Sequence, residues 1–545
     1  MYDLLIRHAR IIDGTGGPAF NGDIGIVDNR IVAIRSFLSE EAHTVIDAGG
    51  LVVAPGFVDA HTHDDLAALR KFTILPKIHQ GVTSVVIGNC GFGMAPIVPE
   101  RMQAVKDYAA PILGEDKQPW NWRTMSAFLQ TLNNTPLGQN VAVLLAHGTL
   151  RVAVMGFEQR AATEQEIIAQ EALIEEAMQA GVVGMSLGLA YVPGGYTPTA
   201  ELVRLARIVG RYRGVITAHM RNEGDELLAS TNELLTIAEQ GEVAMHISHL
   251  KITGRKNWGH IQAALDLISD ARARGLDITV DVYPYSAGST TITQLLPPWI
   301  KEGGVSNMLK QLGEAGVQRR VCQDFSRPLP GWDNPVYANG WERMYLSSVQ
   351  LEKHKPLEGM NLVQASEQLG MSPEETLFQL VLEEKGQATL IMFTMDERDV
   401  DKVVQAPFSM IGSDGIPILS GRPHPRLYGT FPRFIERYVR TLKSLSLEQA
   451  IYKTTAYPCE RFGFRDRGIV ADGKIADLVI FDPATISDKA TYDNPQVYPD
   501  GIKAVLVGGQ TVVLDDAVGQ AHRPGGQLIT PTRDSEIGRS KDDRA

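Results

Sequence analysis

The sequence predicts an α/β protein whose largest part is a (β/α)8 TIM-like barrel. Eight short apolar runs follow one another through the middle of the chain, most of them about 30 residues apart, with helix-like stretches between them. These runs are continuous rather than alternating, which is typical of parallel strands buried on both faces. Shorter β-branched runs occur at both ends of the chain and predict a second, smaller β domain.

The two ends of the chain are predicted to form the small domain, from residues 1–58 and 465–518. Near the start, "DLLIRHARIID" and "DIGIVDNRIVAI" are short β-rich runs broken by turn signals, and "KIADLVIFD" and "IKAVLVGGQTVVL" have the same character near the end. Segments of this kind can pair into one sheet. Residues 519–545 are expected to be a mobile tail, or an arm that lies on a partner.

Residues 59–464 are predicted to form the barrel. The eight expected strands end at His63, Cys90, Gly148, Leu189, Met220, Leu250, Tyr285 and Gly415. Helix-start signals lie between them, because Thr163 with Glu166 and Ser446 with Gln449 have the spacing of a capping box. The distance between the last two strands is too long for one helix, so we expect a partly helical insertion at about 290–390 near the active-site face.

Composition and charge narrow the class of protein. Hydrophobic residues make up 44% of the 545 residues and charged residues 21%, which is ordinary for a globular protein. A net charge of −12 argues against a general nucleic-acid or anionic-membrane binder, which would need basic clusters. The three cysteines are far apart, which favours a reducing cytoplasm over a disulfide framework. The sequence does not decide whether the chain forms a homo-oligomer.

Polar side chains at the predicted strand ends carry the chemical signal. Active sites of (β/α)8 barrels lie at the carboxyl ends of the strands. The residues there that can bind a metal are His61, His63, Cys90, His219, His249 and Asp414. Imidazole, thiolate and carboxylate are zinc ligands, and six of them suit a pair of metal sites with a bridging group. Taken alone, Cys90 could instead fill the core or act as a nucleophile.

Several motifs show a resemblance to a known family. "GFVDAHTHDD", the histidines at 219 and 249, and "IGSDG" resemble the amidohydrolase superfamily. "GNCGFGMAP", "LLAHGTLR", "SHLK", "DVYPY" and "GSDGIP…RPHPRLYGTFPR" more closely resemble the N-acyl-D-amino-acid deacylases (D-aminoacylases). The resemblance implies a metal-dependent barrel with a small β-sandwich domain built from both chain ends. It also implies hydrolysis of N-acyl-D-amino acids to a carboxylate and a free D-amino acid.

The resemblance also assigns roles to the polar residues. Many related enzymes bridge two metals with a carboxylated lysine on strand four, but strand four here reads "GMSLGL", and the deacylases use the cysteine that corresponds to Cys90. The resemblance implies a tight zinc site of Cys90, His219 and His249, and a second, weaker site bordered by His61, His63 and Asp414. Asp414 is the implied general base, which passes the proton of the attacking water to the leaving nitrogen.

The substrate is expected to bind beside these ligands. The resemblance implies that Lys251, Tyr283 and Ser289 bind the α-carboxylate of the amino acid. Tyr191 and Met395 are expected to border its side chain, and their apolar character favours hydrophobic D-amino acids. No nucleic acid or membrane partner is expected.

Three alternatives stay open at this point. The first is a deacylase of N-acyl-D-glutamate or N-acyl-D-aspartate, in which Arg398 or Arg422 would bind the side-chain carboxylate. The second is a cyclic-amide hydrolase of the hydantoinase or dihydroorotase kind. The third is a barrel without catalytic activity, which would be expected to have lost some of the six ligands.

Overall fold

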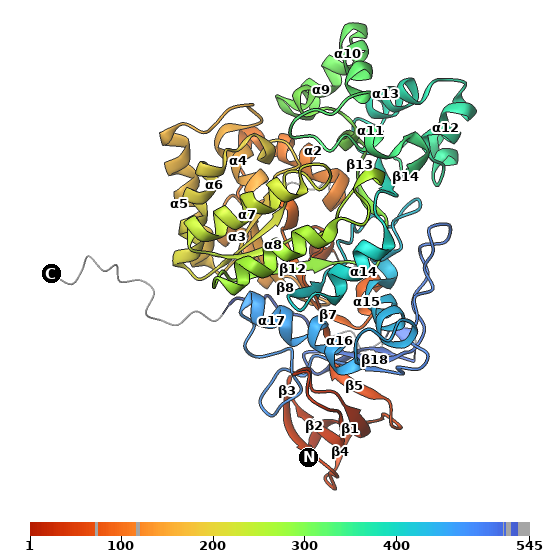
Figure 1. Ribbon diagram of the computed structural model, residues 1–545. Helices are drawn as coiled ribbons and strands as arrows, with labels where there is room; N and C mark the ends of the chain where they lie inside the picture. Colours follow the sequence, from red (N-terminus) through yellow and green to blue (C-terminus); the bar gives the residue numbers. More distant parts are fainter. Residues whose placement is uncertain (71–74, 116–119, 516, 519–524, 532–545) are drawn as a thin grey trace, which may run out of the picture.

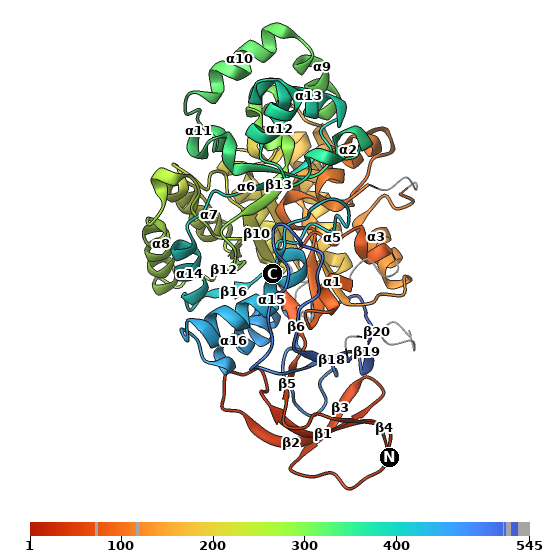
Figure 2. The same ribbon diagram turned by 90° about the vertical axis from the view of Figure 1, so that its right-hand side faces the viewer.

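The computed structural model describes residues 1–70, 75–115, 120–515, 517–518 and 525–531. Figures 1 and 2 show a barrel at the centre, the small sheet at one end of it and a helical insertion, coloured green, at the other. No helix within the described ranges has both the length and the apolar character needed to cross a membrane.

A barrel of eight parallel strands forms the centre of the molecule, as the sequence predicts. In spatial order the strands are β6 (Phe57–Asp59), β7 (Val82–Ile87), β8 (Asn140–Ala146), β9 (Gly184–Gly188), β10 (Val215–His219), β11 (Ala244–Ile247), β12 (Ile278–Val282) and β16 (Ser409–Ile411). The first and last strands close the barrel, since Ala60 N donates to Ile411 O at 3.4 Å and Asp414 N donates to His61 O at 2.8 Å. Most strands end before the predicted position, because the residues beyond them bend into the rim.

Helices form the outer layer of the barrel. They include α5 (Glu164–Ala180), α6 (Thr199–Arg211), α7 (Leu227–Gly241), α8 (Ile261–Ala273), α14 (Glu397–Gln405) and α16 (Leu447–Thr454). The predicted capping boxes are confirmed at the starts of α5 and α16. The other α-helices outside the insertion are α1 (Leu75–Ile78), α2 (Met102–Leu113), α3 (Met125–Asn133), α4 (His147–Met155), α15 (Arg426–Phe434) and α17 (Ala456–Phe462).

The two ends of the chain meet in a separate nine-stranded sheet. Its strands are β1 (Tyr2–Ile11), β2 (Phe20–Val27), β3 (Arg30–Arg35), β4 (Ala42–Asp47), β5 (Val52–Pro55), β17 (Leu478–Phe481), β18 (Ile502–Val507), β19 (Gln510–Leu514) and β20 (Ala517–Val518). Antiparallel pairing of β5 with β17 joins the two ends, with Val53 opposite Ile480. Both residues are buried in the core of this domain.

The insertion folds around its own apolar core. It contains the helices α9 (Gly304–Leu312), α10 (Ala315–Phe325), α11 (Pro335–Asn339), α12 (Leu362–Leu369) and α13 (Pro373–Glu383), and an unpredicted antiparallel sheet of β13 (Gly288–Thr291), β15 (Thr389–Met392) and β14 (Met344–Ser348). Met308, Leu346, Leu377 and Leu390 are among the buried residues of this second core. The insertion therefore stands on the carboxyl end of the barrel as a compact unit (Figure 2).

The prediction of a mobile tail is wrong for residues 525–531. This segment runs along the start of β8, where Val141 N donates to Gln527 O at 2.9 Å and Ile529 N donates to Val141 O at 2.8 Å. Ile529 is buried, and burial of its side chain explains why the segment is held on the barrel. Residues 519–524 and 532–545 of the predicted tail lie outside the described residues.

Candidate metal centre

Six side chains meet at the carboxyl end of the barrel. In the described part of the chain, three groups of metal-binding atoms each lie within 4.8 Å of one another: His61 with His63 and Cys90, Cys90 with His219 and His249, and His61 with His249 and Asp414. Cys90 is central, with its Sγ 3.3 Å from His61 Nε2 and 3.4 Å from His249 Nε2. These are the six residues that the strand-end pattern singles out.

The backbone is unusual at three of these residues. Cys90 has a φ of 53°, His249 of 37° and Asp414 of 50°, all in the left-handed region that few residues with a side chain adopt. Conformations of this kind cluster at functional sites, where the surrounding structure enforces them. Gly188 on β9 packs against the Cys90 turn so closely that an added Cβ would lie 2.0 Å from the Cys90 carbonyl oxygen. The turn that presents the thiol therefore needs glycine on the fourth strand.

The charge state of Cys90 fits a metal ligand. Burial raises the pKa of its thiol, but the imidazoles of His61 and His249 outweigh burial and hold the pKa well below its ordinary value. A thiolate is an anionic, soft ligand that suits zinc. Nδ1 of His63 and Nδ1 of His219 are buried without a hydrogen-bond partner in the described part of the chain, which fits a site completed by a metal ion. The donor set therefore fits zinc.

The side chain of Asp281 orients the rings of His61 and His246, a role that the sequence analysis missed. Its Oδ2 lies 3.1 Å from His61 Nδ1 and 2.8 Å from His246 Nε2, and its Oδ1 accepts a hydrogen bond from the His249 backbone N–H at 2.9 Å. Burial raises the pKa of Asp281, but the two imidazoles hold it well below its ordinary value. A carboxylate behind an imidazole fixes its tautomer, leaving Nε2 of His61 to face Cys90. No local sequence signal marks this role, because Asp281 and His61 lie 220 positions apart.

Glu223 has a similar role behind His249, and sequence reasoning missed it as well. It lies on the loop after β10, with Oε1 3.0 Å from His249 Nδ1 and 2.7 Å from Lys251 Nζ. Burial raises the pKa of Glu223, but Lys251 and the nearby histidines hold it well below its ordinary value. Lys251, which is expected to bind the substrate carboxylate, therefore also forms an ion pair with Glu223. The available signal was a carboxyl group four residues after His219.

Asp414 forms an ion pair with a buried arginine. Nη1 of Arg426 lies 2.9 Å from Asp414 Oδ2, while Asp414 Oδ1 is 3.1 Å from His63 Nε2. Burial raises the pKa of Asp414, but Arg426 and the histidines hold it well below its ordinary value. The carboxylate is therefore ionised and can accept a proton. Sequence reasoning missed Arg426, although it lies within the quoted stretch "RPHPRLYGTFPR".

Comparison with known proteins identifies the family. A sequence model described as the amidohydrolase family matches residues 44–324 and 336–513. The chain belongs to the amidohydrolase family. It is 37% identical over 521 residues to a D-aminoacylase of Alcaligenes xylosoxydans xylosoxydans, covering 96% of each chain. It is also 36% identical over 524 residues to an N-acyl-D-glutamate deacylase of the same organism, again covering 96% of each.

One solved structure is similar to this protein over nearly its whole length. It is an N-acyl-D-glutamate deacylase from Bordetella bronchiseptica in complex with zinc and a phosphonate inhibitor that mimics the tetrahedral intermediate of the reaction. The identity is 34%, the TM-score is 0.83, and the match covers 97% of this chain and 99% of that one. The barrel and the sheet built from both chain ends are therefore the fold of this family.

A cavity opens from the metal centre of this amidohydrolase. Four of the predicted substrate residues line it, namely Tyr191, Lys251, Tyr283 and Ser289. Met395 differs from the prediction, because its backbone N–H bonds to Ser286 O at 3.3 Å and its side chain packs in the barrel core. Met392 lines the cavity instead, at the end of β15. The insertion contributes further lining residues that were not predicted, including Gln294, Trp332, Asp333 and Asn339.

The two arginines considered for an acidic side chain do not line this cavity. Arg398 is exposed on α14, where its guanidinium pairs with Asp396 at 2.9 Å. Arg422 lies against the backbone of β14, where its N–H bonds to Ser347 O at 2.8 Å. Neither side chain is therefore placed to bind a substrate in this amidohydrolase.

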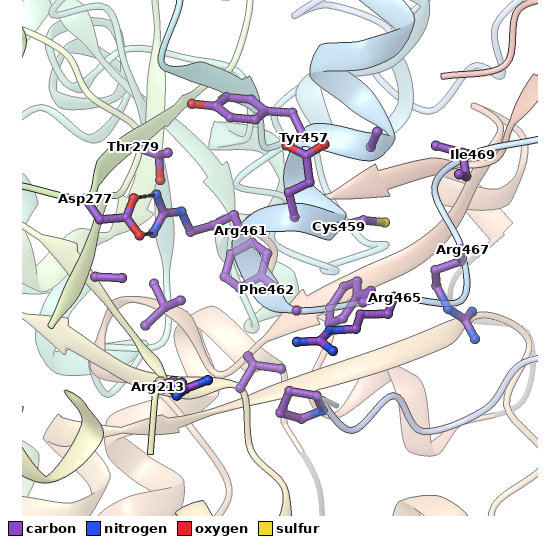
Figure 3. A pocket seen from close by; sticks show the side chains of 18 of the residues that line it. Arg213, Asp277, Thr279, Tyr457, Cys459, Arg461, Phe462, Arg465, Arg467 and Ile469 are labelled. Atoms are coloured by element: carbon purple, nitrogen blue, oxygen red, sulfur yellow. Dashed lines mark hydrogen bonds and ion pairs between the residues drawn. The ribbon is translucent and has the colours of Figure 1, made fainter. Parts of the chain in front are cut away.

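A different cavity, of about 840 Å³, lies at the amino-terminal end of the same barrel. The starts of the strands line it, with Val215, Ala244 and Asp277 facing helix α17. Figure 3 shows Arg461 of this helix reaching across to Asp277, with which it forms a two-fold ion pair. This end of a barrel contributes to stability rather than catalysis, and the metal-binding groups found in the described residues lie at the other end.

Proposed function

We propose that the chain is a zinc-dependent hydrolase of N-acyl-D-amino acids that releases a carboxylate and a free D-amino acid. The observation that carries this proposal is the position of Cys90, an ionised thiol in contact with His61 and His249 where a second metal would otherwise need a carboxylated lysine. The relatives named above as deacylases support the substrate class.

The ligands divide into two sites. Cys90, His219 and His249 would hold a tight zinc ion. His61, His63 and Asp414 would hold a second, weaker ion, since Asp414 Oδ1 lies 3.6 Å from His61 Nε2 and 3.1 Å from His63 Nε2. When bound, zinc lowers the pKa of a water molecule and polarises the amide carbonyl. Asp414 accepts the proton of the attacking water at its carboxylate and delivers it to the leaving nitrogen. Arg426 keeps this carboxylate ionised between turnovers.

The substrate carboxylate would bind in the same cavity, beside the metal ligands. Lys251 Nζ lies 5.8 Å from the centre of the Tyr283 ring, and Ser289 lines the same cavity on β13. We assign the α-carboxylate of the amino acid to these three residues, because a cation and two hydroxyl groups can all donate to it. Tyr191 would border the rest of the substrate, since its ring packs 4.8 Å from that of His219.

An assay of amine release distinguishes this function from the cyclic-amide alternative. The enzyme is stripped of metal, reloaded with zinc, and given N-acetyl-D-leucine, N-acetyl-D-glutamate, N-acetyl-L-leucine and a hydantoin. We expect zinc to restore hydrolysis of at least one D compound and of neither the L compound nor the hydantoin. Turnover of the hydantoin alone would contradict the proposal. The absence of a lysine from β9 (Gly184–Gly188) already disfavours that outcome.

We also infer that the protein works in a reducing compartment, the cytoplasm. Its three cysteines are all free, and Cys322 is exposed on α10. An exposed thiol of this kind persists where reductants are present. The proposed partner is the small-molecule substrate, and any assembly of chains remains to be measured by light scattering.

A further inference from the structure

A second chamber lies beside the cavity at the metal centre. Phe92, Tyr191 and Gln294 line both, so the two spaces share a wall. Beyond them the second chamber is bordered mainly by apolar side chains from α2, α9 and the loop after α4, among them Tyr108, Pro111, Phe157, Val305 and Met308. We call this space the distal chamber. No residue of the distal chamber has a place in the mechanism above except the wall that it shares.

A continuous row of aromatic rings connects the metal centre to the distal chamber. Phe92 lies edge-on to His63, with ring centres 6.4 Å apart, and stacks on Tyr108 at 4.6 Å. Tyr108 in turn contacts Phe157 at 5.7 Å. A flexible apolar arm of a substrate could lie along this wall, because burying its methylene groups against rings is favourable.

The distal chamber contains a lysine that has no carboxylate partner. Nζ of Lys301 donates to the side-chain oxygen of Gln294 at 2.6 Å, and among the described residues no carboxylate forms an ion pair with it. Asp107 borders the same chamber but accepts a hydrogen bond from Gln103 at 2.7 Å instead. Burial therefore lowers the pKa of Lys301 to about 7, with no neighbouring charge to oppose it. Lys251, in contrast, forms an ion pair with Glu223.

We propose that the distal chamber binds a carboxylate at the far end of an apolar arm of the substrate, with Lys301 as its counterion. This inference rests on the proposed function and narrows its substrate class to N-acyl-D-amino acids with a second, distal carboxylate. The aromatic wall contacts the methylene groups of the arm, and the ammonium group of Lys301 pairs with the carboxylate at its end. An incoming carboxylate gives the partly buried Lys301 the ion-pair partner that it lacks, which favours binding of an acid over its neutral amide.

The arm could be the side chain of the amino acid or the acyl group, and paired substrates distinguish the two. For the side chain, kcat/KM is compared between N-acetyl-D-glutamate and N-acetyl-D-glutamine. For the acyl group, N-glutaryl-D-leucine is compared with its terminal carboxamide. We expect the acid to exceed its amide by about 10-fold or more in one of the two pairs.

Variants of Lys301 then test the counterion. In Lys301→Met and Lys301→Gln we expect the acid-to-amide ratio of that pair to fall about 10- to 100-fold, whereas Lys301→Arg keeps most of it. Lys310→Met, which removes an exposed lysine of α9, is the matched control and should leave the ratio unchanged. Circular dichroism of each variant shows whether it folds.

The outcomes separate this inference from the proposed function. Hydrolysis of N-acetyl-D-leucine with no preference for either acid, or a preference that Lys301→Met and Lys301→Gln both retain, overturns the role of the distal chamber and leaves the deacylase function standing. If the zinc-loaded enzyme hydrolyses none of the tested N-acyl-D-amino acids, both the inference and the proposed function are overturned.

Discussion

A carboxylate oxygen of Asp281 lies 3.1 Å from Nδ1 of His61, on the side of the ring opposite the Cys90 thiol. The carboxylate thus holds the ring from behind while its other nitrogen faces the metal centre. Partners of this kind are known to contribute to metal affinity, although they do not touch the metal.

We therefore expect Asp281→Asn to weaken zinc binding by about 10- to 100-fold. The amide keeps the size of the side chain but loses the charge that stabilises the bound orientation of His61. Competition with a chromogenic chelator measures the affinity. Asp270→Asn, at an exposed position on α8, serves as the control. Equal affinity in Asp281→Asn and the wild type would show that the contact is only structural.

Cys90→Ala is expected to lose zinc and activity together. The thiolate contacts two of the histidines, and its removal takes an anionic ligand from the tight site. We expect a fall in activity of about 100-fold or more, with bound zinc measured by atomic absorption on the same sample. Cys322→Ala removes an exposed thiol and should change neither quantity. Full zinc occupancy in Cys90→Ala would contradict our assignment.

The buried Lys77 is expected to stabilise the closure of the barrel between its first and last strands. Lys77 forms an ion pair with Asp59 and donates to Thr62 Oγ1 at 2.7 Å and Ser413 Oγ at 2.6 Å, linking β6 to β16. Lys77→Met leaves the Asp59 charge uncompensated, which should lower the free energy of unfolding by about 3–5 kcal/mol. Urea denaturation measures this.

The double variant Asp59→Asn/Lys77→Met distinguishes the charge from the packing. If the uncompensated carboxylate causes the loss, the double variant should be more stable than Lys77→Met alone. Additive destabilisation by the two changes would instead assign the loss to packing.

The contact between Asp333 of the insertion and the loop after β10 should make the stability of the protein depend on pH. Asp333 accepts hydrogen bonds from the backbone N–H groups of Glu223 at 3.1 Å and Gly224 at 3.2 Å. Burial and the Glu223 carboxylate raise the pKa of Asp333 to about 7. The native state therefore keeps a proton that the unfolded chain releases near pH 4, so this contribution to stability is lost as the pH rises from about 4 to about 7.

Asp333→Asn removes this titration while keeping the shape of the side chain. We expect the melting temperature of the variant, relative to that of the wild type, to increase between pH 5 and pH 8. Differential scanning fluorimetry across this range measures both proteins. A constant difference at every pH would rule out Asp333 as the titrating group.

The sequence predicts the barrel well because two independent patterns coincide there. Continuous apolar runs mark the buried strands, and polar residues follow each run at the rim, so the six residues of the metal centre could be named from spacing and resemblance. Asp281 was missed because its role depends on a contact between segments far apart in the chain, whereas Glu223 and Arg426 lie much nearer to their partners in sequence and were overlooked. Asp281 contacts His61 across 220 positions, which no local pattern reveals.

Two errors have the same origin. Met395 was expected in the cavity because it is apolar and near the rim, but the turn after β15 directs it to the core. Residues 525–531 were expected to belong to a mobile tail or an arm on a partner, yet Ile529 is buried beside β8 of the same chain. Local composition cannot show whether a distant surface offers such a position.

The pairing of β5 with β17 has a consequence for how the protein is made. β5 is synthesised long before Leu478–Phe481, the strand that covers its second edge. In the interval β1 can pair with one edge of β5, but the other edge stays unpaired next to the first strand of the barrel. A nascent chain arrested before residue 478 should therefore bind chaperones that recognise extended apolar segments, and release from them should coincide with synthesis of the final sheet strands.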